Sequence, residues 1–120
     1  MLTIRPQQFR RLEEYMFEQF LLECAQIVRE RRPGLAARLG DEKALREFVG
    51  ASVKRWQGQG FTEREHLIRL LDWECEYGVG YLEEPRWEWA RQIFSLRLDP
   101  ASRIFRVEKR MGILRERGEL

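Results

Sequence analysis

Apolar residues recur at steps of three and four along most of the chain, which is the spacing of one face of an α-helix. In the first third they form one series: Phe9, Leu12, Met16, Phe20, Cys24 and Ile27, widened by Leu21 and Val28. Pro6 suits a first helical turn, because its missing N–H would be unpaired there in any case. Pro33-Gly34 is expected to end this long first helix.

Turn and cap residues divide the middle of the chain. We expect a short helical turn from Leu35 to Leu39, closed by Gly40. Asp41 is then suited to N-cap a second helix, which Gly58-Gln59-Gly60 stops. One side of that helix carries the residues expected to face the core: Leu45, Phe48, Val49, Ser52, Val53 and Trp56.

Three further helices are predicted after Gly60. Thr62 and Glu65 have the spacing of a capping box, and the helix that they begin is expected to run to about Tyr77. Pro85 suits the first position of a fourth helix, and Asp99-Pro100 begins a last one. The expected inward residues are Leu67, Leu70, Leu71 and Cys75, then Trp89, Ile93 and Phe94, then Ile104, Val107, Met111 and Leu114.

No strand-like alternation extends beyond a few residues, and no internal repeat or linker interrupts the pattern. The sequence therefore predicts an all-α fold: a single helical domain over residues 1–120, formed by a compact bundle of about five helices.

Composition agrees with a globular chain, since 43% of the 120 residues are hydrophobic and 35% are charged. No segment approaches the roughly 18 apolar residues of a membrane span, and the first residues contain no signal-peptide core. We therefore expect a cytoplasmic protein without a membrane partner, unless another protein carries it out. Cys24 and Cys75 lie on apolar-patterned helices, which favours two buried free thiols.

The sequence does not support enzyme chemistry. His66 is the single histidine, so neither a His-x-x-x-His nor a Cys-x-x-Cys metal motif is present. No serine or cysteine lies in a strand-turn-helix elbow, and no glycine loop of the phosphate-binding type occurs. Neighbouring carboxylates such as Glu83 and Glu84 lie among residues expected to be exposed, which does not indicate an acid–base pair. We expect no catalytic residue, no metal and no cofactor.

Charge is unevenly distributed along the chain. Acidic residues gather between positions 72 and 88: Asp72, Glu74, Glu76, Glu83, Glu84 and Glu88. Basic residues gather near the C-terminus: Arg103, Arg106, Lys109, Arg110, Arg115 and Arg117. Four of them follow nearly the spacing of the apolar series and form a basic ridge along its edge: Arg103, Arg106, Arg110 and Arg117. The two groups could pair within the chain, the ridge could bind phosphates with tryptophans stacking on bases, or both could orient a protein partner. A net charge of only +2 makes a nucleic-acid partner unlikely.

Aromatic residues accompany the acidic group. Trp73 and Trp87 fall off the main apolar stripes, so partial exposure and core packing are both open for them, whereas Trp89 has the spacing of a core residue. Exposed aromatic residues are enriched at interface hot spots. Our hypothesis is a partner-binding surface with an apolar centre of Trp73, Tyr77, Tyr81 and Trp87. Its rim, formed by Glu83, Glu84 and Glu88, would select a basic partner.

Three pieces of the sequence carry a resemblance: LTIRPQQF at the start, GFTEREHLIRLL in the middle, and EPRWEWA at residues 84–90. In these pieces the chain resembles small helical proteobacterial proteins that are encoded beside type VI secretion effectors and their loading adaptors. The resemblance implies an accessory role, as an adaptor or co-chaperone for an effector or its loading chaperone. An immunity protein that neutralises a neighbouring toxin is the alternative in the same setting.

Overall fold

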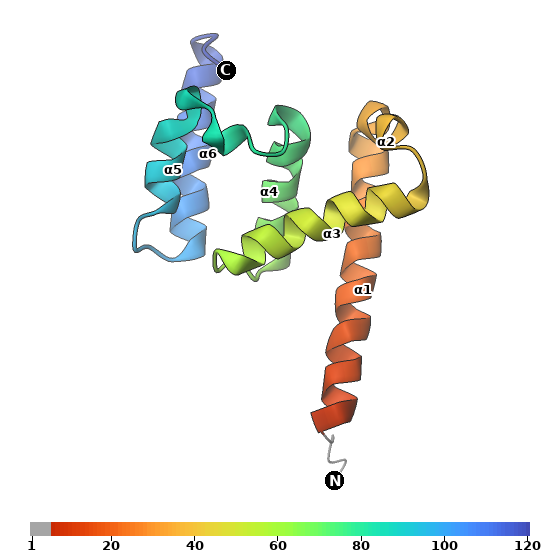
Figure 1. Ribbon diagram of the computed structural model, residues 1–120. Helices are drawn as coiled ribbons and strands as arrows, with labels where there is room; N and C mark the ends of the chain where they lie inside the picture. Colours follow the sequence, from red (N-terminus) through yellow and green to blue (C-terminus); the bar gives the residue numbers. More distant parts are fainter. Residues whose placement is uncertain (1–5) are drawn as a thin grey trace. The chain divides into compact units, whose positions relative to one another are not determined.

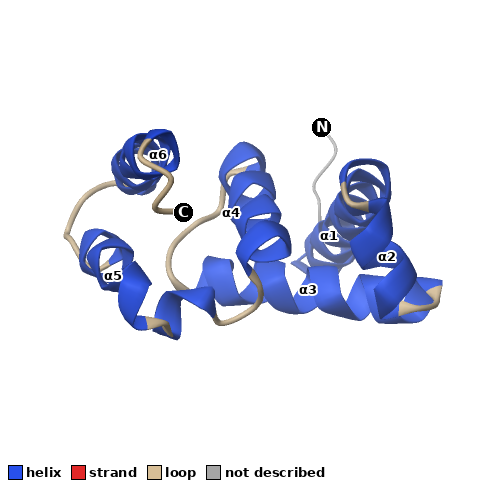
Figure 2. Cartoon of the chain, turned by 90° about the horizontal axis from the view of Figure 1, so that it is seen from above, coloured by secondary structure: helices blue, strands red, loops and turns tan. Residues whose placement is uncertain are grey.

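The structure is a computed structural model, which describes residues 6–120 (Figure 1). These residues form six α-helices and two short 3-10 turns, and no strand occurs among them (Figure 2). The predicted all-α class is confirmed. The sequence predicted about five helices, and the additional one is the short segment after Pro33. The chain divides into two compact units, Met1–Lys54 and Arg55–Leu120.

In the first unit, helix α1 spans Pro6–Arg31 and α2 spans Pro33–Leu39. Pro33 both follows the end of α1 and occupies the first position of α2, where its missing N–H leaves nothing unpaired. Gly40 ends α2 with φ of 101°, a conformation that favours glycine. The predicted short turn is therefore a two-turn helix that lies beside the end of α1 (Figure 1).

Helix α3, Glu42–Gly58, begins as predicted. The Asp41 carboxylate accepts a hydrogen bond of 2.8 Å from the backbone N–H of Ala44, which makes Asp41 the N-cap. In the first unit α3 crosses α1 where Leu21 lies 3.8 Å from the position that a side chain on Gly50 would occupy. The buried residues of this unit come from both helices: Cys24, Ala25, Val28, Leu45, Val49, Ser52 and Val53.

The long apolar series of α1 is only partly buried. Cys24 and Val28 belong to the core, but Leu12 and Met16 are 46% and 62% exposed. In Figure 1 the N-terminal half of α1 extends beyond its crossing with α3. The segment Leu2–Arg5 and the side chain of Phe9, which also entered the sequence prediction, lie outside the described residues.

The second unit contains the end of α3 and three more helices: α4 (Arg64–Tyr77), α5 (Glu88–Phe94) and α6 (Pro100–Glu116). Helix α6 lies beside both α4 and α5. The buried positions on α4 include the predicted Leu67, Leu70 and Leu71, and those on α6 include the predicted Ile104, Val107 and Met111. Leu114 and Cys75 are half-buried.

Two predicted helix starts differ from the structure. Helix α4 begins at Arg64 with Glu63 at the N-cap position and no side-chain cap, so the predicted Thr62–Glu65 capping box does not form. Pro85 begins a 3-10 turn, and α5 starts three residues later at Glu88. As a result Ala90 and Phe94 are the buried residues of α5, whereas the predicted Trp89 and Ile93 are half-buried.

An aromatic cluster fixes the end of α3 against α5. The rings of Trp56, Phe61 and Phe94 lie with centroids 5.2 to 6.0 Å apart, close to the edge-to-face arrangement that aromatic rings favour. Phe61 is fully buried just before α4 begins. Its position therefore determines where the chain enters α4.

Candidate protein-binding surfaces

The segment between α4 and α5 folds over a second aromatic cluster. Its members are Tyr77, Tyr81, Trp87 and Trp89. The Trp87 ring centroid lies 4.8 Å from that of Tyr77, 4.9 Å from Tyr81 and 5.6 Å from Trp89. Trp87 is 0% exposed and Tyr81 is 2% exposed. These rings therefore pack mainly on one another.

This burial corrects the expected apolar centre of the binding surface. Trp73 and Trp87 were expected either at the surface or in the core, and the structure places both in the core, together with Tyr81. Tyr77 is half-buried. Trp73 lies within α4, three residues after the buried Leu70. The spacing of Tyr81 and Trp87 was misleading because Gly78 and Gly80, with φ of 97° and 82°, interrupt the helix before them and turn the chain back on itself. The face on which Trp87 lies cannot be read through such a turn.

The backbone of this segment is tied to α5. It contains two 3-10 turns, Tyr81–Glu83 and Pro85–Trp87. The Arg91 guanidinium on α5 donates hydrogen bonds to the carbonyl oxygens of Leu82 and Glu84. The buried rings of Tyr81 and Trp87 and the hydrogen bonds from Arg91 therefore stabilise the conformation of this turn.

The outward side chains of the turn are mostly acidic. Glu83, Glu84 and Glu88 are exposed, as predicted for the rim, and Val79 beside them is 55% exposed. Arg86 forms an ion pair of 2.9 Å with Glu84 at the surface. Glu83 and Glu88 form no ion pair within residues 6–120. We refer to Val79, Glu83, Glu84 and Glu88 as the acidic turn.

Glu74 belongs to the core of the second unit rather than to this surface. Its side chain is 5% exposed, accepts a hydrogen bond of 2.8 Å from the Trp56 indole and pairs with Arg55 at 2.5 Å. Burial raises the pKa of the nearby Tyr81 hydroxyl, and the charge of Glu74 and the neighbouring Tyr77 raise it further.

The basic residues near the C-terminus divide into two groups. Arg103 donates to the Phe94 carbonyl oxygen at 3.1 Å and lies over the Phe61 ring. Arg115 pairs with Glu76 at 3.1 Å and donates to the Tyr77 hydroxyl at 2.7 Å. The hydrogen bond with Tyr77 is the main reason why the pKa of Arg115 is raised. The ion pair of Arg115 with Glu76 therefore supports pairing of the acidic and basic groups within the chain, whereas Arg103 is held by a carbonyl oxygen and a ring.

Arg110 lies over the Trp89 ring, 5.4 Å from its centroid. The other three cations lie on what we call the outer face of α6, formed by Phe105, Arg106, Lys109, Ile113 and Arg117. Its three cations are exposed and form no ion pair within the described residues. Phe105 and Ile113 are 65% and 42% exposed between them. Hollows of about 630 and 300 Å³ lie along this face, and both are lined by Arg106 and Lys109.

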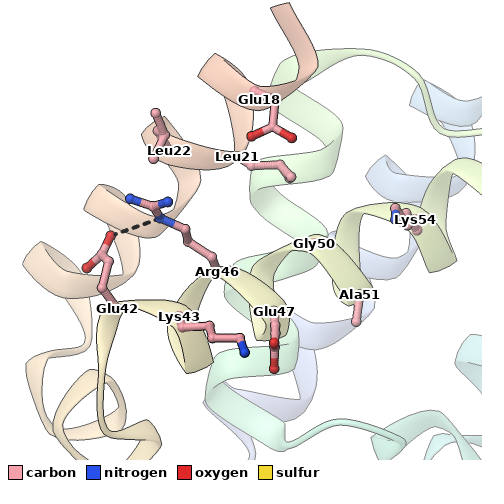
Figure 3. Close-up of a pocket in the computed structure, with 10 residues that line it drawn as sticks. All are labelled: Glu18, Leu21, Leu22, Glu42, Lys43, Arg46, Glu47, Gly50, Ala51 and Lys54. Carbon is pink, nitrogen blue, oxygen red and sulfur yellow. Dashed lines mark ion pairs between the residues drawn. The ribbon is translucent and has the colours of Figure 1, made fainter. Parts of the chain in front are cut away.

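The first unit contains a separate groove of about 730 Å³ between α1 and α3 (Figure 3). Leu21, Leu22, Gly50 and Ala51 supply its apolar surface. The rim carries three acidic and three basic side chains: Glu18, Glu42, Glu47, Lys43, Arg46 and Lys54. Arg46 pairs with Glu42 at 3.5 Å across the end of the groove. This groove can accept an apolar side chain, and its balanced rim gives no preference for the charge of a ligand.

The described residues 6–120 contain no group of three or more His, Cys, Asp or Glu side chains placed to hold a metal ion. The Nε2 atom of His66 lies 3.6 Å from a Glu63 carboxylate oxygen. Among the same residues, no helix has both the length and the apolar character needed to cross a membrane.

No protein-family model, curated protein or solved structure matches the chain significantly. The resemblance to accessory proteins of type VI secretion therefore stays a prediction from the sequence.

Proposed function

We propose that this chain is a non-enzymatic, protein-binding accessory factor that holds a basic partner on its acidic turn. The sequence resemblance to accessory proteins of type VI secretion makes the proposed role more specific: an adaptor or co-chaperone for an effector or its loading chaperone. It acts in the cytoplasm, before secretion.

The observation that supports this proposal is the contrast between the two sides of the turn. Tyr81 and Trp87 are buried beneath it, and Glu83, Glu84 and Glu88 are exposed above it. A surface that is already ordered loses little conformational entropy on binding. Glu83 and Glu88, which form no ion pair within residues 6–120, attract a positively charged protein and select against an acidic one.

The acidity of the turn also favours the second candidate, an immunity protein. Such a protein can cover the basic active site of a toxin, and carboxylates provide the complementary charge. The third candidate is a nucleic-acid-binding domain that uses the outer face of α6. The second unit contains 12 basic and 12 acidic side chains, which supports this candidate less well.

The test measures binding of the purified chain to each protein encoded beside it. Glu83→Lys/Glu84→Lys reverses the charge of the turn, and we expect at least a tenfold loss of affinity. Glu65→Lys/Glu119→Lys changes the net charge equally at exposed positions elsewhere and is the matched control. Equal affinity of both variants for every partner would contradict the proposal.

Co-expression with the neighbouring effector separates the first two candidates. A co-chaperone is expected to raise the solubility or secretion of the effector while its toxicity remains. Rescue of the cells from toxicity would instead support the immunity protein.

A further inference from the structure

Helix α1 carries an exposed face that the fold of its own unit does not use. Leu12, Tyr15 and Met16 are 46%, 61% and 62% exposed and follow the i, i+3, i+4 spacing of one helix face. At about 100° per residue, Leu12 and Met16 point away from the side that carries Leu21 and Val28. We call Leu12, Tyr15 and Met16 the outer face of α1.

The charge around this face is basic just before Leu12, where Arg10 and Arg11 lie, and acidic after it. Between Leu12 and Glu23 the helix contains four glutamates and neither Lys nor Arg. Glu13 and Glu18 flank the exposed apolar residues on opposite sides, and both are exposed. This part of α1 is thus an acidic amphipathic helix.

The outer face of α6 is mainly of the opposite charge. From Phe105 to Arg117 the helix contains five basic and two acidic residues. Its exposed apolar residues, Phe105 and Ile113, lie between the free cations Arg106, Lys109 and Arg117. Both segments are close to 18 Å long at about 1.5 Å per residue.

We infer that α1 of one copy of this chain packs on α6 of a second copy. Apolar contact between the two outer faces would remove Leu12, Tyr15, Met16, Phe105 and Ile113 from water, which stabilises the pair. The glutamates of α1 would then lie beside the cations of α6, and this arrangement sets which surfaces meet.

A second copy of this chain is the partner that fits these two faces best. The glutamates of α1 and the cations of α6 carry opposite charge, and exposed large apolar residues occur on both faces. A phosphate backbone would use the cations of α6 but would leave Phe105 and Ile113 without a role. The acidic turn takes no part in this contact, so self-association goes beyond the proposed function and does not depend on it.

The test is sedimentation velocity of the purified full chain at low ionic strength over a range of concentrations. Two charge reversals are compared: Glu13→Lys/Glu18→Lys on α1, and Arg106→Glu/Lys109→Glu on α6. In each variant alone the two faces carry like charge, and we expect self-association to weaken at least tenfold. In a mixture of the two variants, each α1–α6 contact between copies of different variants again joins opposite charges, and we expect these mixed contacts to restore association.

Two further variants complete the design. Phe105→Ser tests the apolar part of the contact and should weaken association without changing charge. Glu83→Lys/Glu84→Lys in the acidic turn should leave it unchanged. A wild-type chain that stays monomeric, reversals without effect, or a mixture that fails to associate would each overturn the inference. So would a monomer that binds poly(dT) through Arg106 and Lys109.

Discussion

At the scale of single residues, the aromatic cluster below the acidic turn contains two buried polar atoms. The Tyr81 hydroxyl and the Trp87 indole N–H have no hydrogen-bond partner within residues 6–120. A buried polar group without a partner costs about 1–3 kcal/mol. Burial of the large rings offsets this cost, so both residues stabilise the fold through their apolar surface.

Replacing Tyr81 by Phe tests this explanation. The ring contacts with Tyr77 and Trp87 stay, and the unpaired hydroxyl is removed. We expect the free energy of unfolding to stay the same or to rise by up to about 1–3 kcal/mol. Urea denaturation of the wild type and of Tyr81→Phe measures this free energy. A clear loss of stability would show that the hydroxyl has a partner in solution.

The two thiols should differ in reactivity. Cys24 is 0% exposed, and burial raises its pKa from 9.0 to about 12, whereas Cys75 is half-buried. Because the thiolate is the reactive form, we expect a thiol reagent to modify Cys75 well before Cys24. Mass spectrometry after timed labelling identifies the modified residue. Faster labelling of Cys24 than of Cys75 would contradict the burial of this face of α1 in the first unit.

At the scale of secondary-structure elements, the helix starts show which sequence signals are reliable. Asp41 and Asp99 were predicted as N-caps, and both accept a hydrogen bond from the backbone N–H three residues later. Thr62 and Glu65 are equally suitable as capping residues, but they do not form the predicted capping box. Phe61, fully buried with Trp56 and Phe94, fixes the preceding chain, so tertiary packing determines the start of α4.

Replacing Asp41 by Ala removes the acceptor at the start of α3. We expect a loss of about 0.5–2 kcal/mol in the free energy of unfolding, because the Ala44 N–H loses its partner. Asp41→Asn keeps a side-chain acceptor and is the matched control, with little expected change. Thermal unfolding followed by circular dichroism compares the three proteins. Equal losses for both variants would assign the effect to charge rather than to capping.

Trp87→Ala should act on folding rather than on an exposed contact. The side chain is 0% exposed and touches Tyr77, Tyr81 and Trp89, so its removal leaves a cavity. We expect the free energy of unfolding to fall by about 3–5 kcal/mol. Val79→Ala, on the exposed part of the same turn, should change stability little. A stable Trp87→Ala protein would refute this packing.

At the scale of the whole molecule, the helical class followed from the sequence because apolar spacing holds inside each helix. The candidate surface was less predictable. The acidic residues Glu83, Glu84 and Glu88 were placed correctly at the surface, since charge predicts exposure without knowledge of chain direction. The directions of Trp87 and Tyr81 depend on the backbone of a non-helical turn, for which periodicity carries no information.

The stability of the chain should fall in alkaline solution. The pKa of Tyr81 is raised in the folded state above its ordinary value of 10.0, chiefly by burial. A raised pKa contributes stability that is complete below pH 10 and is lost as the pH rises further. We expect the free energy of unfolding to fall above this pH more steeply for the wild type than for Tyr81→Phe. Parallel curves would show that Tyr81 ionises normally.

The distribution of indole side chains has a practical consequence for following the two units. All four tryptophans, Trp56, Trp73, Trp87 and Trp89, lie in the unit Arg55–Leu120, and the unit Met1–Lys54 has none. Intrinsic fluorescence near the red edge of protein absorption therefore reports on one unit only, whereas far-ultraviolet circular dichroism reports on both. A loss of ellipticity that precedes any red shift of emission would be the spectroscopic signature of the first unit melting by itself.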